Sequence, residues 1–237
     1  MPYSYKDAMI KVVKSIERPQ CFALSHPSKI STSDNCAFSL PAGPKFSCPG
    51  ATEACVGCYA MKGRHVFTNV QSAFAKNWLL LRHCERYNQM DKAVSLISDK
   101  IKKDAAIFRI HESGDFHSQW AIEMWARVIR ERNSILFWAY TRSFMFNYTH
   151  ILKNPNFALW ASTDNINSKA AEKFVKRYQK YSVKHAYGPW KHDALVPPNS
   201  FVCPVTSHVL KMGGACERCK LCIMRDRTCK NVVFLEH

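Results

Sequence analysis

The 237-residue sequence has no long hydrophobic run. Its longest uninterrupted apolar run covers residues 135–140, far short of the roughly 20 residues that a membrane-spanning helix needs. The opening residues Met1–Ser4 lack the basic and apolar regions of a signal peptide. Internal repeats, low-complexity tracts and Ser/Gly linkers are missing too. These absences predict a cytoplasmic protein that is neither exported nor bound to a membrane.

Acidic residues are also few, with 18 Asp and Glu against 34 Lys and Arg and a formal charge of +16. At 47% hydrophobic residues the chain can build a core, which excludes disorder as its general description. The positive charge predicts a polyanionic partner such as nucleic acid or a nucleotide. Basic residues recur at helical spacing at Lys169, Lys173, Lys176, Arg177, Lys180 and Lys184. A solvated helix surface explains them equally simply.

Cysteine is abundant, with eleven residues. A disulfide framework is disfavoured because the cytosol keeps thiols reduced. Seven of the cysteines form two spaced groups, C-x6-C-x2-C at 48–58 and C-x12-C-x2-C-x2-C at 203–222. The four that stand singly are Cys21, Cys36, Cys84 and Cys229. Such spacing predicts metal binding, because a two-residue gap lets both thiolates reach one centre.

The later group consists of Cys203, Cys216, Cys219 and Cys222. A C-x2-C-x2-C run is an iron–sulfur ligand pattern whose fourth ligand comes from elsewhere in the chain, and Cys203 supplies a thiolate for it. Zinc prefers two separated pairs of ligands. The spacing therefore favours a [4Fe–4S] cluster, with a zinc-stabilised module as the alternative.

The earlier group, Cys48, Cys55 and Cys58, lies in a loop punctuated by Gly and Pro. Three close cysteines without a local fourth leave one position of a cluster open, as a catalytic cluster requires. Alternatively, Cys36 or His65 completes a purely structural site. The spacing does not distinguish these two possibilities.

The middle of the chain alternates strand-like and helix-like segments, which predicts an α/β fold with parallel strands. Strands are expected at 36–40, 107–111, 135–140, 157–162, 183–187 and 200–203, and helices within 66–103 and at 119–132, 143–153 and 168–181. About six strands make an open sheet or a partial barrel. We expect a β/α domain over residues 1–200 and a cysteine-rich C-terminal segment, 201–237, packed on it.

Polar residues follow three of these strands, at His111–Asp115, Tyr140–Ser143 and Ser162–Asn165. Ligands of α/β proteins bind beyond the carboxyl ends of parallel strands, where the loop that carries Cys48–Cys58 is also expected. Arg142 is a candidate anion ligand. Helix capping is the alternative role for such residues, and His111 is expected to be a core histidine.

The motifs at 39–43, 48–60, 109–116, 139–143 and 203–222 resemble the phage protein family called gene product 88, over roughly residues 25–225. The family name alone implies no chemistry. It does imply that the host cytoplasm is where this chain acts.

The cysteine triplet followed by β/α units is more distantly similar to the radical S-adenosylmethionine superfamily, although that superfamily usually has C-x3-C-x2-C. The resemblance implies a partial (β/α)6 barrel, a [4Fe–4S] cluster on Cys48, Cys55 and Cys58, and an auxiliary cluster on the later cysteines. It also implies S-adenosylmethionine as cofactor. The residues implied to face that cofactor or a substrate are Ser113, Gly114, Asp115, Thr141, Arg142, Ser162, Thr163 and Asp164.

Three functions follow. The first is a radical enzyme that acts on a nucleotide, nucleic acid or peptide and needs an electron donor. The second is a non-catalytic iron–sulfur protein for redox chemistry or nucleic-acid binding. The third is a zinc-stabilised nucleic-acid-binding module.

Overall fold

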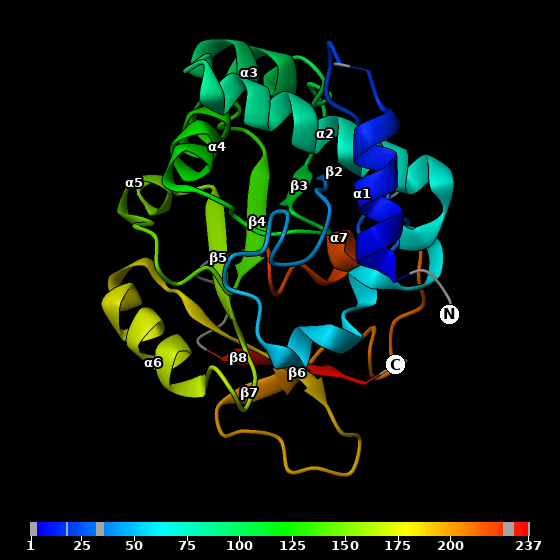
Figure 1. Cartoon of the computed structure of the whole chain (residues 1–237). Coiled ribbons are helices and arrows are strands. Elements are labelled where there is room, and N and C mark those ends of the chain that lie inside the picture. Colours follow the sequence, from blue (N-terminus) through cyan, green and yellow to red (C-terminus); the bar gives the residue numbers. More distant parts are fainter. Residues whose placement is uncertain (1–3, 18, 32–35, 225–229, 237) are drawn as a thin grey trace.

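The computed structural model describes residues 4–17, 19–31, 36–224 and 230–236. Eight strands form one mixed sheet in the order β1-β2-β3-β4-β5-β6-β8-β7 (Figure 1). Only the pairing of β1 with β2 is antiparallel. The strands are β1 (Leu24–Ser25), β2 (Ala37–Phe38), β3 (Ile107–Ile110), β4 (Leu136–Thr141), β5 (Phe157–Thr163), β6 (Lys184–Trp190), β7 (Ser200–Val202) and β8 (Asn231–Leu235).

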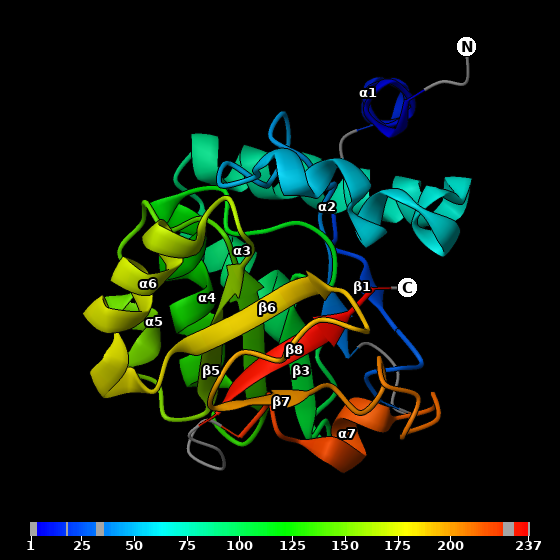
Figure 2. The ribbon, with the colours of Figure 1, turned by 90° about the horizontal axis from the view of Figure 1, so that it is seen from below.

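Most of the helices lie in the connections between strands β2 and β6 and gather on one side of the sheet, whereas one short helix near the C-terminus lies on the other side (Figure 2). The α-helices are α1 (Tyr5–Ser15), α2 (Thr68–Arg86), α3 (Met90–Ser98), α4 (Gln119–Glu131), α5 (Thr149–Leu152), α6 (Ser168–Arg177) and α7 (Ala215–Cys219). Four 3-10 helices accompany them: η1 (Glu53–Gly57), η2 (Tyr59–Met61), η3 (Gly63–Val66) and η4 (Gln179–Tyr181). No helix in the described ranges is long and apolar enough to cross a bilayer.

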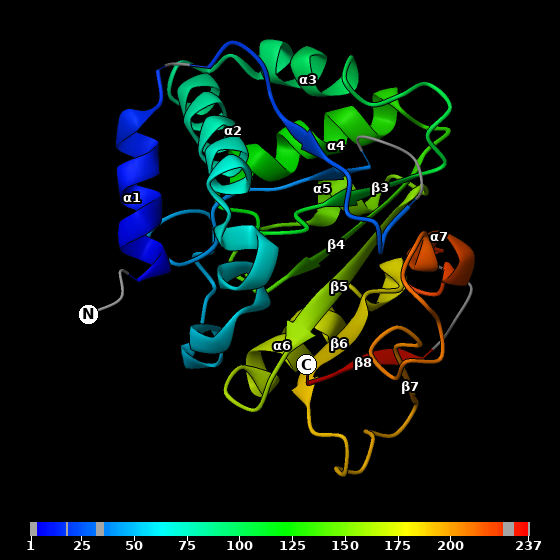
Figure 3. The ribbon, with the colours of Figure 1, turned by 90° about the vertical axis from the view of Figure 1, so that its right-hand side faces the viewer.

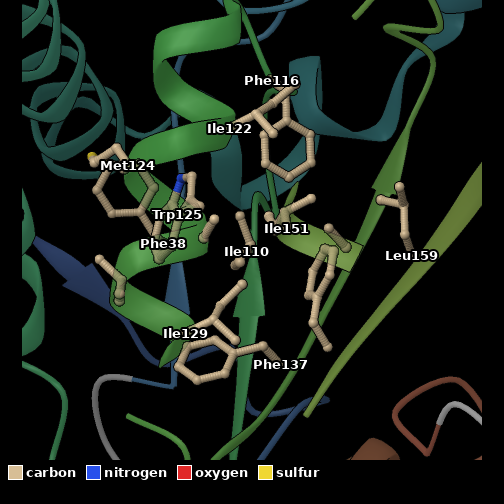
Figure 4. Packing of buried hydrophobic residues seen from close by; sticks show 14 of the residues in the cluster. Phe38, Ile110, Phe116, Ile122, Met124, Trp125, Ile129, Phe137, Ile151 and Leu159 are labelled. Atoms are coloured by element: carbon tan, nitrogen blue, oxygen red, sulfur yellow. The ribbon is translucent and has the colours of Figure 1, made fainter. Parts of the chain in front are cut away.

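The main core lies between this helical layer and the sheet. Successive strand residues point to opposite faces, so Phe137 and Leu159 face the helices while their neighbours face away. Helix α4 begins at Ser118, whose hydroxyl accepts a hydrogen bond from the amide of Ala121 at 3.2 Å, and it buries Trp125 completely. Figure 4 shows these side chains interlocked between α4 and the strands.

The opposite face of the sheet is covered by the cysteine-rich C-terminal segment instead of long helices (Figure 3). Trp138 and Trp160 point to this side. They pack with Ile223 and Ala215 of that segment, which are both buried. The chain then returns as β8 into the sheet between β6 and β7, so part of residues 201–237 belongs to the sheet itself.

The α/β class and the predicted central elements are confirmed, with boundaries shifted by a few residues. Helix α1 and strands β1 and β8 were not expected. These three elements lie outside the middle of the chain, where the alternation of strand-like and helix-like segments made the elements predictable. The sheet is open, with β1 and β7 as its edges. A partial (β/α)6 barrel is a finer statement that stays a prediction, and Cys229 lies outside the described residues.

Candidate functional site

The early cysteine loop docks on the carboxyl ends of the strands, as predicted. The Ser47 hydroxyl donates to the carbonyl of Pro41 at 2.7 Å and accepts from the amide of Asp115 at 3.4 Å. Gly50 packs so tightly that a Cβ there would lie 2.1 Å from the carbonyl oxygen of Arg142. Gly114 has φ +88°, and a Cβ would lie 2.5 Å from Ser47 Oγ. Both glycines are needed for this close approach.

Asp115 joins the ends of β3 and β4. Its buried carboxylate accepts from the Thr141 hydroxyl at 2.7 Å, the Arg142 amide at 2.8 Å, the Ser143 hydroxyl at 3.0 Å and the Phe116 amide at 2.7 Å. Burial raises the pKa of Asp115, and these hydrogen bonds oppose the rise. The carboxylate therefore orders the strand ends beneath the cysteine loop.

Arg142 and Asp164 form an ion pair between the ends of β4 and β5. Asp164 also accepts from the Thr52 hydroxyl of the cysteine loop at 3.2 Å, and Thr52 Oγ1 lies 4.0 Å from Cys55 Sγ. Burial acts to raise the pKa of Asp164, but the amide of Asn167 and the Arg142 guanidinium hold it below its usual value. A charged pair thus lies directly beside the thiols.

Cys48, Cys55 and Cys58 lie in one loop, and electrostatic effects on the thiol pKa values link Cys58 to Cys48 and to Cys55. Burial raises the pKa of Cys48 to about 12, with Asp115 and Cys58 adding to the rise. Burial also raises the pKa of Cys58, where Cys55 adds to the rise and the positive charge of Arg142 opposes it. The amide of Gly43 donates to Cys48 Sγ at 3.3 Å. A backbone amide thus lies beside Cys48, and the charges of Arg142 and Lys62 act on Cys58.

Neither expected fourth ligand joins this group. The Nε2 atom of His65 lies 3.0 Å from Oε1 of Glu112, an ion pair that sequence reasoning did not anticipate. Cys36 precedes β2, whereas the cysteine loop follows that strand. It is buried in the apolar cluster that contains Ile107 and Ile223. The early site therefore has three thiols and neither of these two side chains.

The later cysteines lie on the face of the sheet opposite the main helical layer. Cys203, Cys216 and Cys219 each add to the raised pKa of Cys222, whose largest cause is burial. The indole N–H of Trp160 donates to the carbonyl of Cys222 at 2.8 Å, which fixes the end of the C-x2-C-x2-C run to β5.

Helix α7 carries the middle of this later site and is held by backbone contacts. The amides of Gly214, Cys216 and Glu217 donate to the carbonyls of Ser28, Lys29 and Ile30 at 2.7, 3.0 and 3.0 Å. These bonds satisfy amides at the helix start that have no partner inside the helix. A segment almost 190 residues earlier in the chain thus positions Cys216.

Arg109 connects the two cysteine groups. Its side chain donates to the Tyr59 hydroxyl at 3.2 Å, next to Cys58, and lies 5.1 Å from the centre of the Tyr140 ring. Tyr140 in turn hydrogen-bonds the Cys222 thiol. Burial acts to raise the pKa of Cys216, and the Arg109 charge opposes this rise. Arg109 could have been singled out from the sequence, because a charged residue within an otherwise apolar strand is unusual and needs a buried partner.

The remaining predicted residues are held by internal partners. Ser113 Oγ donates to the carbonyl of Leu40 at 2.9 Å, and Thr163 Oγ1 donates to that of Ala161 at 2.9 Å. Ser162 is half-buried, and its carbonyl accepts from the Asn167 side chain at 3.0 Å. His111 is buried among aromatic rings, burial lowers its pKa to about 3, and its ring nitrogens have no partner among the described residues.

In the part of the chain that the structure describes, no three His, Cys, Asp or Glu side chains are arranged to hold a single metal ion. The donor chemistry nonetheless fits iron–sulfur ligation, because each group offers at least three thiols with a cation nearby. The raised pKa values of Cys48, Cys58, Cys216 and Cys222 mean that ligation would release protons from these thiols.

Known proteins match this chain in sequence. The family model described as Gene product 88 matches residues 11–225. The Gene 88 protein of Mycobacterium phage L5 is 32% identical over 209 residues, which cover 84% of this chain and 85% of the relative. The Gene 88 protein of Mycobacterium phage D29 is 33% identical over 199 residues, which cover 79% of this chain and 82% of that relative. No solved structure matches. The first resemblance is confirmed, and the radical S-adenosylmethionine resemblance stays a prediction.

Proposed function

The chain belongs to the gene product 88 family of phage proteins, and we propose that it is an iron–sulfur protein with two [4Fe–4S] sites. Cys203, Cys216, Cys219 and Cys222 would hold one cluster, and Cys48, Cys55 and Cys58 the other. The observation that carries the proposal is the placement of the two spaced cysteine segments, one docked at the strand ends through Ser47 and Thr52 and the other fixed to the opposite face of the sheet through Cys222 and helix α7. The two segments are separated by about 150 residues in the sequence and lie on different sides of the fold.

Charge compensation supports clusters at both sites. A [4Fe–4S]²⁺ cluster with four thiolates carries a net charge of about −2, and one with three carries about −1. Arg109 lies near Cys216, and Arg142 and Lys62 lie near Cys58. These cations offset the negative charge that cluster loading would bring.

We propose further that the early cluster is open at its fourth position. His65 is paired with Glu112, and Cys36 lies beyond the other end of β2, so neither is placed to complete the site. An S-adenosylmethionine bound there would supply radical chemistry when the cluster is reduced. The Arg142–Asp164 pair and Ser162 lie at the same strand ends and would orient a charged ligand. The parallel sheet would then be the wall of a partial (β/α)6 barrel.

The test is anaerobic reconstitution of the full chain. We expect about 7–8 iron per chain with matching sulfide, and broad absorbance near 400 nm. The reduced protein should show an EPR signal that changes when S-adenosylmethionine is added. A variant with all of Cys48, Cys55 and Cys58 replaced by Ala should keep about four iron and lose that change. A colourless protein that contains zinc would overturn the proposal.

One observation favours a non-catalytic iron–sulfur protein as a second candidate. The polar atoms of Asp115, Thr141 and Ser113 are engaged by internal hydrogen bonds. They are therefore less available to a cofactor than their positions in the sequence imply. An EPR signal that S-adenosylmethionine leaves unchanged would select a redox role without radical chemistry.

A further inference from the structure

A pocket of about 340 Å³ lies between the loop that follows β4 and the end of α6, and none of the described cysteines lines it. Its lining includes Arg177, Lys180, Tyr181, Thr149 and Asn147 and contains no carboxylate. Among the described residues, no acidic side chain pairs with Arg177 or Lys180. Two cations facing a hollow of this size are suited to a phosphate-bearing ligand.

The positive charge continues from the pocket along helix α6. This helix buries Ala171 and Phe174 against the core, so its opposite face is exposed. The exposed face carries Lys169, Lys173, Lys176 and Arg177, with Glu172 as its acidic residue. From residue 169 to residue 177 the helix rises about 12 Å, at 1.5 Å per residue. That length exceeds one phosphate group and matches a ligand with several phosphates in series.

Two aromatic rings lie beside the cations. Lys180 Nζ lies 5.0 Å from the ring centre of Tyr181, and the Arg177 guanidinium lies 6.0 Å from that of Tyr178. Tyr178 is buried, and its hydroxyl accepts a hydrogen bond from the Tyr148 amide at 3.0 Å, so it forms a fixed wall. Tyr181 is only half-buried and offers part of its ring to a ligand. Cations that track a backbone next to an aromatic ring are the elements of single-strand recognition.

We propose that the pocket and the basic face of α6 bind single-stranded nucleic acid. Arg177 and Lys180 contact one phosphate at the pocket, Tyr181 stacks on a base, and Lys173 and Lys169 contact phosphates further along the strand. Figures 1 and 2 show α6 at the outer edge of the helical layer and apart from α7. The site goes beyond the proposed iron–sulfur function and does not depend on it.

The test is fluorescence anisotropy of the purified full chain with a labelled 20-nucleotide single-stranded DNA, over a series of salt concentrations. Replacing Arg177 and Lys180 together by Ala should weaken binding by roughly tenfold at low salt. It should also reduce the salt slope by about 0.7, since the two side chains contact one phosphate and each single-strand phosphate contact contributes about 0.7. The matched control replaces the exposed Lys100 and Lys103 by Ala, with the same change in net charge, and should leave affinity within about twofold.

A further variant separates stacking from charge. Tyr181→Leu should weaken binding of single-stranded DNA more than binding of the corresponding duplex, whose bases are already stacked. Absence of binding by the unaltered chain at low salt would overturn the proposal, and so would equal losses in the two double variants. Binding to phosphatidylserine vesicles with the same sensitivity to Arg177 and Lys180, and none to DNA, would assign the face to membranes and also overturn it.

Discussion

The two cysteine groups are positioned by different forces. The early loop is held by polar contacts of Ser47 and Thr52 and by the close approach of Gly50 to β4. Next to its thiols, Val56 is 84% exposed and Tyr59 is 52% exposed. The later group instead lies on the face of the sheet, where Trp160 and Tyr140 contact Cys222.

This difference suggests two kinds of site in one chain. The later site is part of a core, since Ala215 and Ile223 pack against the sheet and α7 takes backbone bonds from residues 28–30. Substitution of its residues should therefore also lower the stability of the fold. The early site is instead a loop held at the strand ends by polar contacts, with half-buried thiols beside the exposed side chains of Val56 and Tyr59. Damage to it should leave the fold intact.

The sharpest test of this comparison is a pair of single cysteine variants. Cys222→Ala and Cys58→Ala should each lower the iron content by about half, because each removes a ligand of one cluster. In the metal-free chain, Cys222→Ala should lower stability by about 1–2 kcal/mol, or about 2–8 °C in Tm, because it leaves a void in buried surroundings. Cys58→Ala should change Tm by less than about 2 °C.

Iron analysis and thermal denaturation followed by circular dichroism provide the two measurements. If Cys58→Ala lowered the Tm of the metal-free chain as much as Cys222→Ala, the distinction between a loop site and a core site would be wrong.

A second test acts on the loop without touching a thiol. Gly50→Ala places a methyl group 2.1 Å from the Arg142 carbonyl oxygen, so the loop must move away from β4. We expect a loss of about 1–3 kcal/mol and the loss of the early cluster alone. Gly57→Ala is the matched control, because its new Cβ meets only the end of the Lys62 side chain at 3.8 Å.

Iron content, together with limited proteolysis of residues 41–67, reports the outcome. Equal iron content in the two glycine variants would show that docking on β4 does not position the early thiols.

The central elements of the fold could be predicted from the sequence because their patterns are local. Helix α4 shows its apolar face and its Ser118 cap, and strand β5 is a continuous apolar run. Strand β8 could not be predicted. Its five residues pair with β6 and β7 only after a long excursion of the chain, and no local pattern encodes that insertion.

The candidate site, like the fold, could be predicted from the sequence only in part. The convergence of Asp115, Thr141, Arg142 and Asp164 follows from parallel topology, which brings strand ends to one edge. The roles of Asp115 and Thr141 as internal hydrogen-bond partners depend on three-dimensional geometry that spacing does not reveal. The pair formed by His65 and Glu112 was missed because its partners lie in two segments far apart in the sequence, and no repeating pattern relates them.

A third test concerns the residue that the two sites share. Arg109→Met removes the buried positive charge near Cys216 and the hydrogen bond to Tyr59. A cation stabilises the reduced, more negative form of a cluster, so its loss should lower the reduction potential of the later cluster. An EPR-monitored redox titration measures this shift. Arg132→Met is the control, because Arg132 binds the carbonyl of Ile101 instead of a cysteine site.

Unchanged potentials in Arg109→Met, with both clusters present, would show that Arg109 does not act on the later site. Tyr140→Phe gives an independent check because it removes only the hydroxyl that bonds the Cys222 thiol. It should lower the same potential by a smaller amount.

The smallest expected effect is a pH dependence of the polar contacts beneath the early loop. Burial acts to lower the pKa of His65, but its hydrogen bond and charge interaction with Glu112 raise it above 6.5. Burial likewise acts to raise the pKa of Glu112, but His65 and Arg109 bring it below 4.5. The contribution of His65 is present below pH 6.5 and is lost as pH rises through its raised pKa. That of Glu112 is present above pH 4.5 and is lost as pH falls through its lowered pKa.

The pair therefore stabilises most between about pH 4.5 and 6.5. Glu112→Gln should lower Tm by about 2–4 °C near pH 5.5, equivalent to about 1 kcal/mol, and by less at pH 8. Glu123→Gln is the control, because its partner His150 is 51% exposed and the surrounding water screens that pair. A Tm difference for Glu112→Gln that stays constant from pH 5.5 to 8 would mean that the ion pair does not hold η3 against β3. The polar anchoring of the early loop would then rest on other contacts, such as those of Ser47, Thr52 and Tyr59.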